Sequence, residues 1–245
     1  TGLTDALMDS IPVVCLTGQV PTHLIGNDAF QECDTTGITR PCTKHNYLVK
    51  EPDVLARTIH EAFYVASHGR PGPVVVQIPR DVSSMDTASA IPTPAARTPH
   101  EPDAALVDKA VAMIDGAKAP LVVAGEMISN QNAADALTKF AAAAGLPVMS
   151  AYRRLDVMPN SHDCYAGHLE INRFENQLEA IDQSDLIISV GTRLDGITSA
   201  DETMFCTGKP LIHIYPEADI LARFESDVAL DADMEPALAA LTAKL

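Results

Sequence analysis

Thirteen residues decide how the first part of the chain folds: Gly69-Arg70-Pro71-Gly72-Pro73-Val74-Val75-Val76-Gln77-Ile78-Pro79-Arg80-Asp81. The opening glycines and prolines end a preceding helix and hold the backbone in a turn. The nearly continuous β-branched run Val74–Ile78 predicts a strand covered on both faces of a parallel sheet. Pro79 is expected to end the strand pairing, so that Arg80 and Asp81 leave at the carboxyl end, where open α/β sheets bind ligands. On pattern alone, a core strand with a solvated charged exit is favoured over a ligand-binding one.

Charge and composition exclude some classes of function. The 245 residues include 33 acidic and 17 basic ones, which gives a net charge of −16. This excess of negative charge argues against binding to nucleic acid or to an anionic membrane. The hydrophobic content of 47% is that of a globular protein. No stretch of about eighteen apolar residues occurs, so no transmembrane helix is expected.

The cysteines and the first residues bear on the context of the chain. Five cysteines show no close metal-type spacing and form an odd set: Cys15, Cys33, Cys42, Cys164 and Cys206. We expect them to be reduced thiols in a cytoplasmic protein rather than disulfides or a zinc site. The chain opens at Thr1-Gly2 already within a predicted helix, and we expect it to be part of a longer protein.

The first segment, residues 1–92, predicts an incomplete parallel α/β unit. A strand over Ile11–Gly18 is followed by a loop from Gln19 to Glu32, with a short helix at its end. Long loops at the carboxyl end of a strand are commonly functional, but the residues alone favour a packed surface loop whose Phe30 fills the core. A helix over residues 52–68 then leads into the Val74–Ile78 strand, a right-handed parallel crossover. Its expected inward face is Leu55, Ile59, Phe63 and Ala66, with Val54 and Ala62 beside them.

A change of composition predicts a linker at 93–101, followed by a doubly wound α/β domain over 102–245. Four prolines lie between positions 92 and 102, among small polar residues. Helix and strand then alternate, with these expected elements: helix Asp103–Asp115, strand Leu121–Ala124, a helix capped by Asn130 and ending at Ala144, strand Pro147–Ser150, an irregular stretch to Leu169, helix Glu175–Asp182, strand Leu186–Val190, strand Leu211–Tyr215, a short helix, and helix Pro236–Leu245.

Three strand ends of the second domain gather candidate ligand groups: Gly125-Glu126-Met127, Gly191-Thr192-Arg193 and Tyr215-Pro216-Glu217-Ala218-Asp219. Glycine turns with an arginine are a way in which such sheets hold a nucleotide. No G-x-G-x-x-G follows any predicted strand, so the usual NAD fingerprint is missing. The sequence shows no metal-binding cluster and no local signature of a Ser-His-Asp or Cys-His set.

Further motifs follow one another in the first segment: Leu16-Thr17-Gly18-Gln19-Val20-Pro21-Thr22, then Ile25-Gly26-x-Asp28-Ala29-Phe30-Gln31-Glu32, Gly37-Ile38-Thr39-Arg40-Pro41, and Thr43-Lys44-His45. Together with the Gly69–Asp81 stretch, which matches G-R-P-G-P-V-x-V-x-x-P-[KR]-D, they closely resemble the catalytic subunit of acetohydroxyacid (acetolactate) synthases. The second segment resembles the middle domain of the same thiamine diphosphate-dependent enzymes through Ser184–Arg193 and Ile212–Glu217.

This resemblance implies a domain assignment. Residues 1–92 would be the later part of the pyrimidine-binding domain, and residues 102–245 the Rossmann-like middle domain. The family's activating glutamate lies earlier and has no counterpart here, and the metal- and diphosphate-binding G-D-G…N motif is absent. The resemblance therefore implies that thiamine diphosphate and Mg²⁺ serve a full-length parent, that this chain carries no catalytic residue and no metal ligand, and that it is inactive by itself.

The resemblance also implies site residues. Gln31 would approach the thiamine diphosphate pocket, and Phe30 and Arg80 would line the substrate pocket. Arg70, Gly125 and Arg193 would contact FAD as a candidate further cofactor. Family members that bind FAD usually continue the last strand end with G-A-R-F-D-D-R, whereas residues 191–197 read G-T-R-L-D-G-I.

The implied parent is a transferase that decarboxylates pyruvate and passes the two-carbon unit to another 2-oxo acid, in branched-chain amino acid biosynthesis. The implied assembly is a homodimer or tetramer, because the family's active site lies between two chains. Two alternatives stay open. One is a thiamine diphosphate-dependent carboligase or decarboxylase with another substrate, and the other is a non-catalytic nucleotide-binding or assembly module.

Overall fold

The chain forms two separate α/β units in the computed structural model, which describes residues 1–93, 98–200 and 208–245. The first unit is Thr1–Arg97 and the second is Thr98–Leu245. The division lies inside the stretch 93–101 that the sequence marks as a linker. Each unit contains its own parallel sheet and its own hydrophobic core.

The first unit is built on strand β3 (Pro73–Pro79), which lies between β1 (Val13–Gln19) and β2 (His45–Leu48). Both neighbours pair with it in parallel. The central strand is buried along most of its length, as its β-branched run predicts. The remaining elements are α1 (Gly2–Met8), the 3-10 turn η1 (Thr22–Leu24), α2 (Thr35–Thr39), η2 (Arg40–Cys42), α3 (Pro52–Ser67) and η3 (Val82–Ser84).

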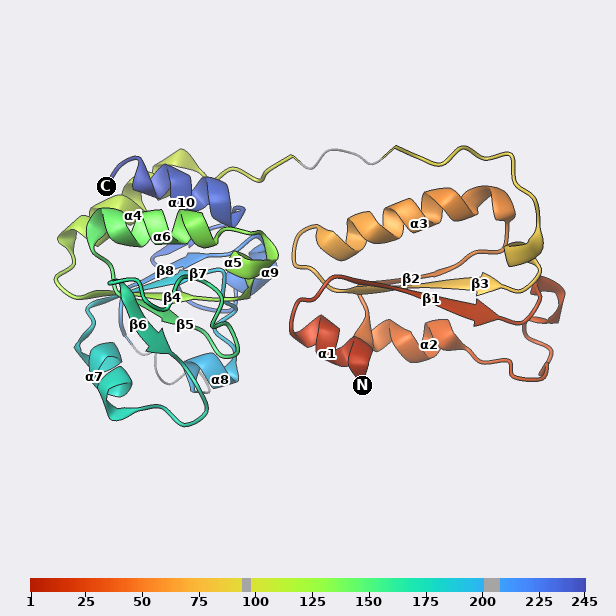
Figure 1. The fold of residues 1–245 in the computed structure, drawn as a ribbon, viewed down its shortest axis with the longest axis horizontal. Helices are drawn as coiled ribbons and strands as arrows, with labels where there is room; N and C mark the ends of the chain where they lie inside the picture. Colours follow the sequence, from red (N-terminus) through yellow and green to blue (C-terminus); the bar gives the residue numbers. More distant parts are fainter. Residues whose placement is uncertain (94–97, 201–207) are drawn as a thin grey trace. The chain divides into compact units, whose positions relative to one another are not determined.

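Helix α3 covers one face of this sheet, and α1 and α2 lie on the other (Figure 1). The core under α3 contains Val74 and Val76 of the central strand together with Ala62 and Ala66 of the helix. The prediction that Phe63 faces inward is wrong, since its side chain is 62% exposed. The buried stripe is Thr58, Ala62 and Ala66. Leu55 and Ile59, which were also predicted to face inward, are partly buried and pack against this core.

Two further details of the first unit differ from the prediction. Strand β2 and helix α2 were not predicted, because His45-Asn46-Tyr47-Leu48 mixes polar and apolar residues in a short edge strand. The expectation that pairing ends at Pro79 is confirmed, because the register of β3 with β1 ends at the pair Gln19 and Pro79, where the Arg80 backbone N–H donates the last bond to the Gln19 carbonyl at 3.0 Å. Phe30 fills no core, since its side chain is 88% exposed.

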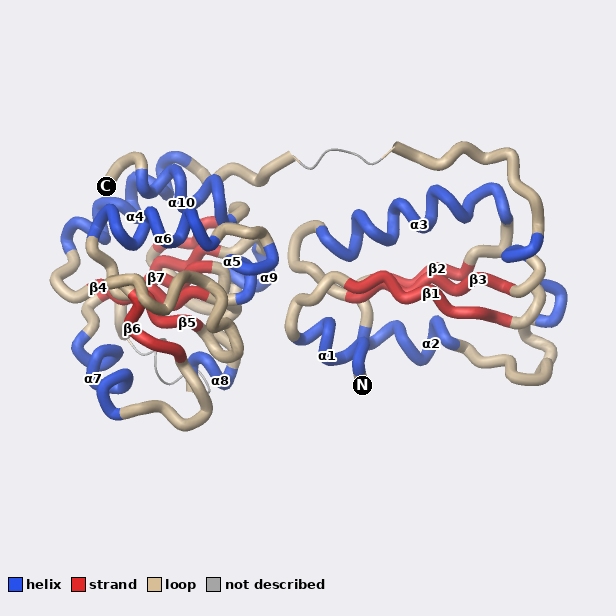
Figure 2. The backbone as a smooth tube through the Cα atoms, in the orientation of Figure 1, coloured by secondary structure: helices blue, strands red, loops and turns tan. Residues whose placement is uncertain are grey.

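The second unit is a six-stranded parallel sheet in the order β6-β5-β4-β7-β8-β9 (Figure 2). Its strands are β4 (Pro120–Ala124), β5 (Val148–Ser150), β6 (Tyr165–His168), β7 (Leu186–Val190), β8 (Leu211–Ile214) and β9 (Val228–Leu230). Its helices are α4 (Ala104–Gly116), α5 (Glu126–Asn130), α6 (Ala134–Ala144), α7 (Glu175–Gln183), α8 (Gly196–Ser199), α9 (Ala218–Leu221) and α10 (Met234–Thr242). Helices α4, α6 and α10 lie on one face, and α7 and α8 on the other. The predicted doubly wound fold is confirmed.

Some boundaries in the second unit were missed. Asn130 ends α5 instead of capping the next helix, which begins at Ala134. That helix ends at Ala144 as predicted, with Gly145 as its C-cap in the left-handed conformation. Strands β6 and β9 and helix α8 were not predicted, because each is only three or four residues long. Of the five cysteines, Cys206 lies outside the described residues, and the other four are free thiols.

The strand order places a topological switch point within the second unit. From β4 the chain moves outward through β5 and β6, then returns to the other side of β4 to form β7, β8 and β9. The direction of winding therefore reverses between β4 and β7. In open α/β sheets, ligands bind beyond the carboxyl ends of the strands at this reversal, which is called the switch point.

Candidate functional site

The candidate site residues predicted from the sequence lie mainly in two places. The first is the loop of residues 20–34, which leaves the carboxyl end of β1 in the first unit. The second is the switch point between β4 and β7 in the second unit.

The loop of residues 20–34 carries Phe30 and Gln31. The Phe30 ring is 88% exposed, and Gln31 has a left-handed backbone with φ 62°. A positive φ is uncommon in a residue other than glycine and costs free energy unless the surroundings fix it. The loop thus holds an aromatic ring in solvent and a strained residue next to it.

Arg80 and Asp81 leave the same sheet at the neighbouring strand β3, whose carboxyl end pairs with that of β1. The Arg80 side chain is exposed. Asp81 instead turns back to the loop, where its carboxylate accepts hydrogen bonds from Thr22. The charged exit of the central strand therefore has two roles: Arg80 faces solvent and Asp81 binds the loop.

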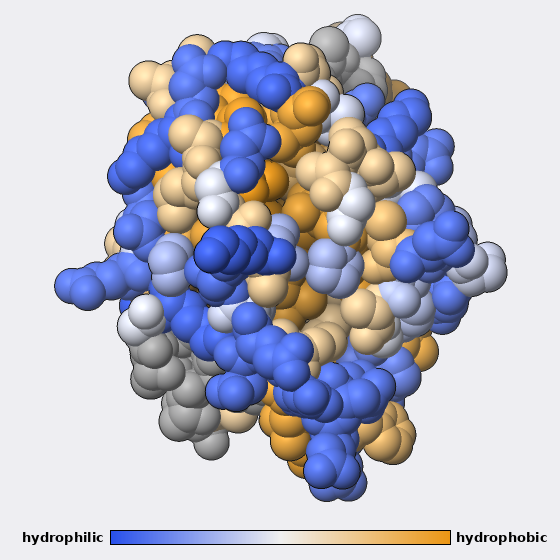
Figure 3. Space-filling model, turned by 90° about the vertical axis from the view of Figure 1, so that its left-hand side faces the viewer, coloured by the Kyte–Doolittle hydropathy of each residue, from blue (hydrophilic) through white to orange (hydrophobic). Residues whose placement is uncertain are grey.

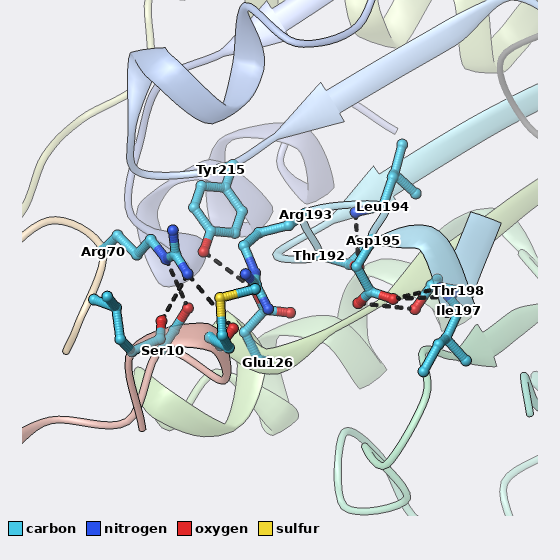
Figure 4. Close-up of polar contacts among 12 residues, drawn as sticks. Ser10, Arg70, Glu126, Thr192, Arg193, Leu194, Asp195, Ile197, Thr198 and Tyr215 are labelled. Atoms are coloured by element: carbon cyan, nitrogen blue, oxygen red, sulfur yellow. Dashed lines mark hydrogen bonds and ion pairs between the residues drawn. The ribbon is translucent and has the colours of Figure 1, made fainter. Parts of the chain in front are cut away.

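Arg70 is engaged at the start of the first unit (Figure 4). Its Nε donates to Ser10 Oγ at 3.1 Å, and its Nη2 donates to the Leu7 carbonyl at 2.7 Å. Leu7 belongs to the last turn of α1, so the guanidinium binds the end of the helix where carbonyl groups lack helical partners. Arg70 fastens α1 beside the turn that leads into β3.

The switch point holds a buried ion pair. Arg193 Nε lies 3.1 Å from Glu126 Oε1, and the two side chains are 11% and 6% exposed. The Tyr215 hydroxyl donates to the same carboxylate oxygen at 3.1 Å (Figure 4). Burial raises the pKa of Glu126 above its usual value, and the Arg193 charge and the Tyr215 hydroxyl oppose that shift. The three strand ends that the sequence groups together therefore do meet, on the adjacent strands β4, β7 and β8.

Glycine makes this arrangement possible. A Cβ at Gly125 would lie 2.3 Å from Thr192 Cβ and 2.8 Å from the Gly191 carbonyl oxygen. Gly191 itself has φ 63°, in the left-handed region. The turns that follow β4 and β7 are therefore packed directly against each other.

These residues do not fit the diphosphate group of FAD. The Arg193 charge already faces the Glu126 carboxylate, which would repel a phosphate at the same place. The backbone N–H groups of Met127 and Ile128 donate to the carbonyls of Gly191 and Gly125. Donors that would hold a diphosphate at the start of α5 are thus used within the protein.

Another buried polar group lies beside the switch point. His213 on β8 is fully buried, and its Nε2 donates to the Thr192 carbonyl at 3.0 Å. Its Nδ1 has no hydrogen-bond partner within the described part of the chain. Burial lowers the pKa of His213 to about 4, and the bond to Thr192 opposes the shift. His213 is therefore neutral near pH 7.

Other possible kinds of site are a metal centre, a membrane-spanning helix and a cleft. Among the described residues, no group of three or more His, Cys, Asp or Glu side chains is placed to hold a metal ion. Nor is any helix in those residues long and apolar enough to cross a membrane.

A cleft of about 650 Å³ lies before β4 and β5, lined by Lys118–Leu121 and Gly145–Pro147 among others. It is at the amino ends of the strands, away from the edge that binds ligands in this fold. On the face shown in Figure 3, hydrophobic residues are surrounded by hydrophilic ones.

The sequence does not show the contacts of two carboxylates. Glu126 stands among the candidate ligand groups at a strand end but is paired with Arg193, and Glu32, which belongs to a motif, accepts hydrogen bonds from the backbone of its own loop. A signal for Glu126 exists in the sequence, since a Glu that follows the glycine after a buried strand lies at the first position of the following helix. Its partner could not be identified in this way, because Arg193 is 67 residues away.

Comparison with known proteins gives a consistent set of relatives. The family described as "Thiamine pyrophosphate enzyme, central domain" matches residues 107–241. The chain is 37% identical over 217 residues to the acetolactate synthase large subunit of Corynebacterium glutamicum, covering 87% of this chain and 35% of that protein. It is 35% identical over 246 residues to the acetolactate synthase isozyme 1 large subunit of Escherichia coli, covering 98% of this chain and 43% of that protein.

A solved structure matches as well. The X-ray structure of a Mycobacterium smegmatis protein assigned as a thiamin diphosphate-dependent enzyme superposes with a TM-score of 0.84 at 24% identity. The match covers 99% of this chain and 47% of that one. At this identity the likeness concerns the fold alone. The chain spans less than half the length of each of these three relatives.

Proposed function

Because the chain belongs to the thiamine pyrophosphate enzyme family, we propose that it is part of a thiamine diphosphate-dependent carboligase of the acetolactate synthase type. The whole enzyme would decarboxylate pyruvate and transfer the two-carbon unit to a second 2-oxo acid. The observation that carries this proposal is the identity of 35% to an acetolactate synthase large subunit over 98% of the chain. It covers both units, including the loop with Phe30 and Gln31.

Within this proposal, residues 1–92 form the later part of the pyrimidine-binding domain and residues 102–245 form the middle domain. When bound, thiamine diphosphate stabilises the negative charge that decarboxylation leaves on carbon. The exposed amide of Gln31 suits a contact with the cofactor pocket, and the exposed Phe30 ring and Arg80 guanidinium suit a 2-oxo acid with its carboxylate. Mg²⁺ and the diphosphate would be held by residues outside this chain, in keeping with the missing G-D-G…N motif.

FAD, which the sequence resemblance implied through Arg70, Gly125 and Arg193, is not part of the proposal. Arg70 binds Ser10 and the end of α1, Gly125 packs against Thr192, and Arg193 binds Glu126. Each of the three residues has a structural partner within its own unit. We therefore infer a family member in which these positions support the fold.

The assembly and location are further parts of the proposal. We propose that the protein is cytoplasmic and forms a homodimer or tetramer. In such an assembly Phe30 and Gln31 would complete a pocket on a second chain. The exposure of Phe30 supports this arrangement, since an aromatic ring kept in solvent suits burial against a partner.

The test is an assay of the complete gene product. Its intact mass should be well above 26.1 kDa, and with thiamine diphosphate, Mg²⁺ and pyruvate it should form acetolactate. Residues 1–245 alone should be inactive in the same assay. Acetolactate formation by residues 1–245 alone, or a gene product of 26.1 kDa, would contradict the proposal.

A second candidate is a carboligase or decarboxylase of the same family with another substrate. It is favoured by the G-T-R-L-D-G-I run at residues 191–197 and by the Glu126–Arg193 pair that this run supports. Pyruvate consumption without acetolactate, or turnover of a different 2-oxo acid, would select it. A full-length protein that binds no thiamine diphosphate would instead select a non-catalytic module.

A further inference from the structure

The loop of residues 20–34 is ordered although its most prominent side chain has no packing partner in the core. Phe30 is 88% exposed and Gln31 has φ 62°. An apolar ring in water and a strained backbone both oppose a fixed loop. Polar contacts at the base of the loop must therefore keep it in place.

Asp81 makes the contact that joins this loop to the centre of the sheet. Its carboxylate oxygens lie 3.0 and 3.1 Å from the Thr22 backbone nitrogen, which donates to them. The Thr22 hydroxyl donates to Asp81 Oδ2 at 2.5 Å. These bonds, chiefly the one from the Thr22 hydroxyl, lower the pKa of Asp81. Asp81 follows β3 directly, so the bonds connect the start of the loop to the central strand across 59 residues of sequence.

Two other side chains close the remainder of the loop. The Glu32 carboxylate accepts hydrogen bonds from the backbone N–H groups of Gly26 and Ala29, which lower its pKa. The Gln19 side chain donates to the Cys33 carbonyl at 3.0 Å and accepts from the Val20 N–H at 2.7 Å. We call Gln19, Thr22, Glu32 and Asp81 the loop frame. Of its members, Asp81 is the one whose side chain reaches into the loop from the end of β3.

We propose that Asp81 is a positioning residue for the active site. Through Thr22 it fixes the start of the loop, so that Phe30 and Gln31 stand at a constant place beyond the carboxyl edge of the sheet. This proposal rests on the proposed function, in which Phe30 and Gln31 line the substrate and cofactor pocket. Asp81 itself does not touch substrate. Its neighbour Arg80 is exposed at the same end of β3. Two consecutive residues would therefore serve the site, Arg80 by lining the substrate pocket and Asp81 by holding the loop.

The role differs from ordinary loop stabilisation in what it predicts. Misplacing a group that positions substrate by about 1 Å costs catalysis on the order of 100-fold even when the fold is intact. A purely structural bond would change unfolding without changing the parameters of the folded enzyme. Steady-state kinetics and local hydrogen exchange separate the two cases.

The experiment uses the full-length protein with Thr22→Val, Thr22→Ser, Asp81→Ala and, as a control, Asp86→Asn. Thr22→Val removes the hydroxyl but keeps the shape and the backbone N–H, whereas Thr22→Ser keeps both donors. Asp86 is an exposed carboxylate five residues further along the chain. Hydrogen exchange is followed in peptides covering residues 20–34 and in those covering α3 and β3, beside kcat and KM for the 2-oxo acid.

Asp81→Ala and Thr22→Val should speed exchange in residues 20–34 but not in α3 and β3. They should lower kcat/KM by about 10- to 100-fold. Thr22→Ser and Asp86→Asn should match the wild type in both measurements. Faster exchange in the loop with kcat/KM within twofold of wild type would overturn the positioning role. Loss of activity that accompanies faster exchange throughout the first unit would overturn it too.

Failure of the proposed function looks different. A wild-type protein without carboligase activity would remove the site that Asp81 is proposed to position, and the positioning role would fall with it. The exchange data would still show whether Asp81 holds the loop.

Discussion

Glu126 and Arg193, 67 residues apart in the sequence, form a buried ion pair where the strand order of the second unit reverses. Doubly wound folds commonly bind a nucleotide at this place. Here the Glu126 carboxylate is paired with the Arg193 guanidinium, and it also accepts a hydrogen bond from the Tyr215 hydroxyl. The switch point is therefore occupied by the protein's own charges.

Breaking this pair should destabilise the second unit. Glu126→Ala leaves Arg193 buried without its partner, and such a change costs about 3–5 kcal/mol. Urea unfolding of the chain followed by far-UV circular dichroism measures the effect. Glu225→Ala, at an exposed loop position of the same unit, is the matched control and should change stability by less than about 0.5 kcal/mol. Equal effects of the two variants would contradict the importance of the pair.

The same pair predicts that the protein carries no flavin. The full-length protein should be purified without flavin absorbance, and titration with FAD or ADP should give no saturable binding. The physical reason is that Glu126 neutralises and covers Arg193. Stoichiometric FAD that is lost in Arg193→Ala would show that the arginine serves the cofactor after all.

Close packing at Gly125 predicts a large cost for one methyl group. Gly125→Ala would place Cβ 2.3 Å from Thr192 Cβ, so the two turns must separate. Overpacking of this kind costs about 1–3 kcal/mol. Gly116→Ala is the control, since a Cβ at Gly116 meets nothing within 4 Å and alanine favours the helix by up to about 1 kcal/mol. Thermal unfolding should move in opposite directions for the two variants.

His213 should make the second unit sensitive to acid. Its pKa is lowered to about 4 in the folded protein, while in the unfolded chain it is near 6.5. Between these two pH values His213 is protonated in the unfolded chain but not in the folded one. The contribution of neutral His213 to the free energy of unfolding is therefore fully present above about pH 6.5 and is lost as the pH falls towards 4. This difference between the pKa of His213 in the unfolded and folded chain corresponds to about 3 kcal/mol in the free energy of unfolding.

The measurement is the free energy of unfolding of wild type and His213→Asn from pH 4 to pH 7. The variant should lose this part of the pH dependence, whatever its stability at pH 7. His23→Asn, at an exposed position, should keep the wild-type slope. Parallel curves for wild type and His213→Asn would show that His213 is not the group responsible.

Phe30 should contribute little to the stability of the chain. Because its ring is 88% exposed, Phe30→Ala should change the free energy of unfolding by less than about 0.5 kcal/mol. Phe140, which is 0% exposed in the core of the second unit, is the comparison, and Phe140→Ala should cost about 3–5 kcal/mol. A large effect of Phe30→Ala would show that the loop packs against the rest of the unit.

The sequence by itself determined the elements whose local signals are strong. The β-branched run Val74–Ile78 lies within a buried strand as predicted, and Leu186–Val190 was predicted with its observed ends. Alternation of such strands with amphipathic helices was enough for a doubly wound domain. Motifs at fixed spacing, such as Ala29-Phe30-Gln31-Glu32, were enough to indicate the family.

The tertiary structure alone decided which distant residues meet. Thr22 and Asp81 come together because β1 and β3 pair in register, and Glu126, Arg193 and Tyr215 because β4, β7 and β8 are neighbours. Neither relation has a local signal, since the pairing of strands depends on the packing of the whole sheet. For the same reason the inward face of α3 was misplaced at Phe63. Hydrophobicity says which residues favour burial, but the distance at which a helix lies on its sheet decides which of them are buried.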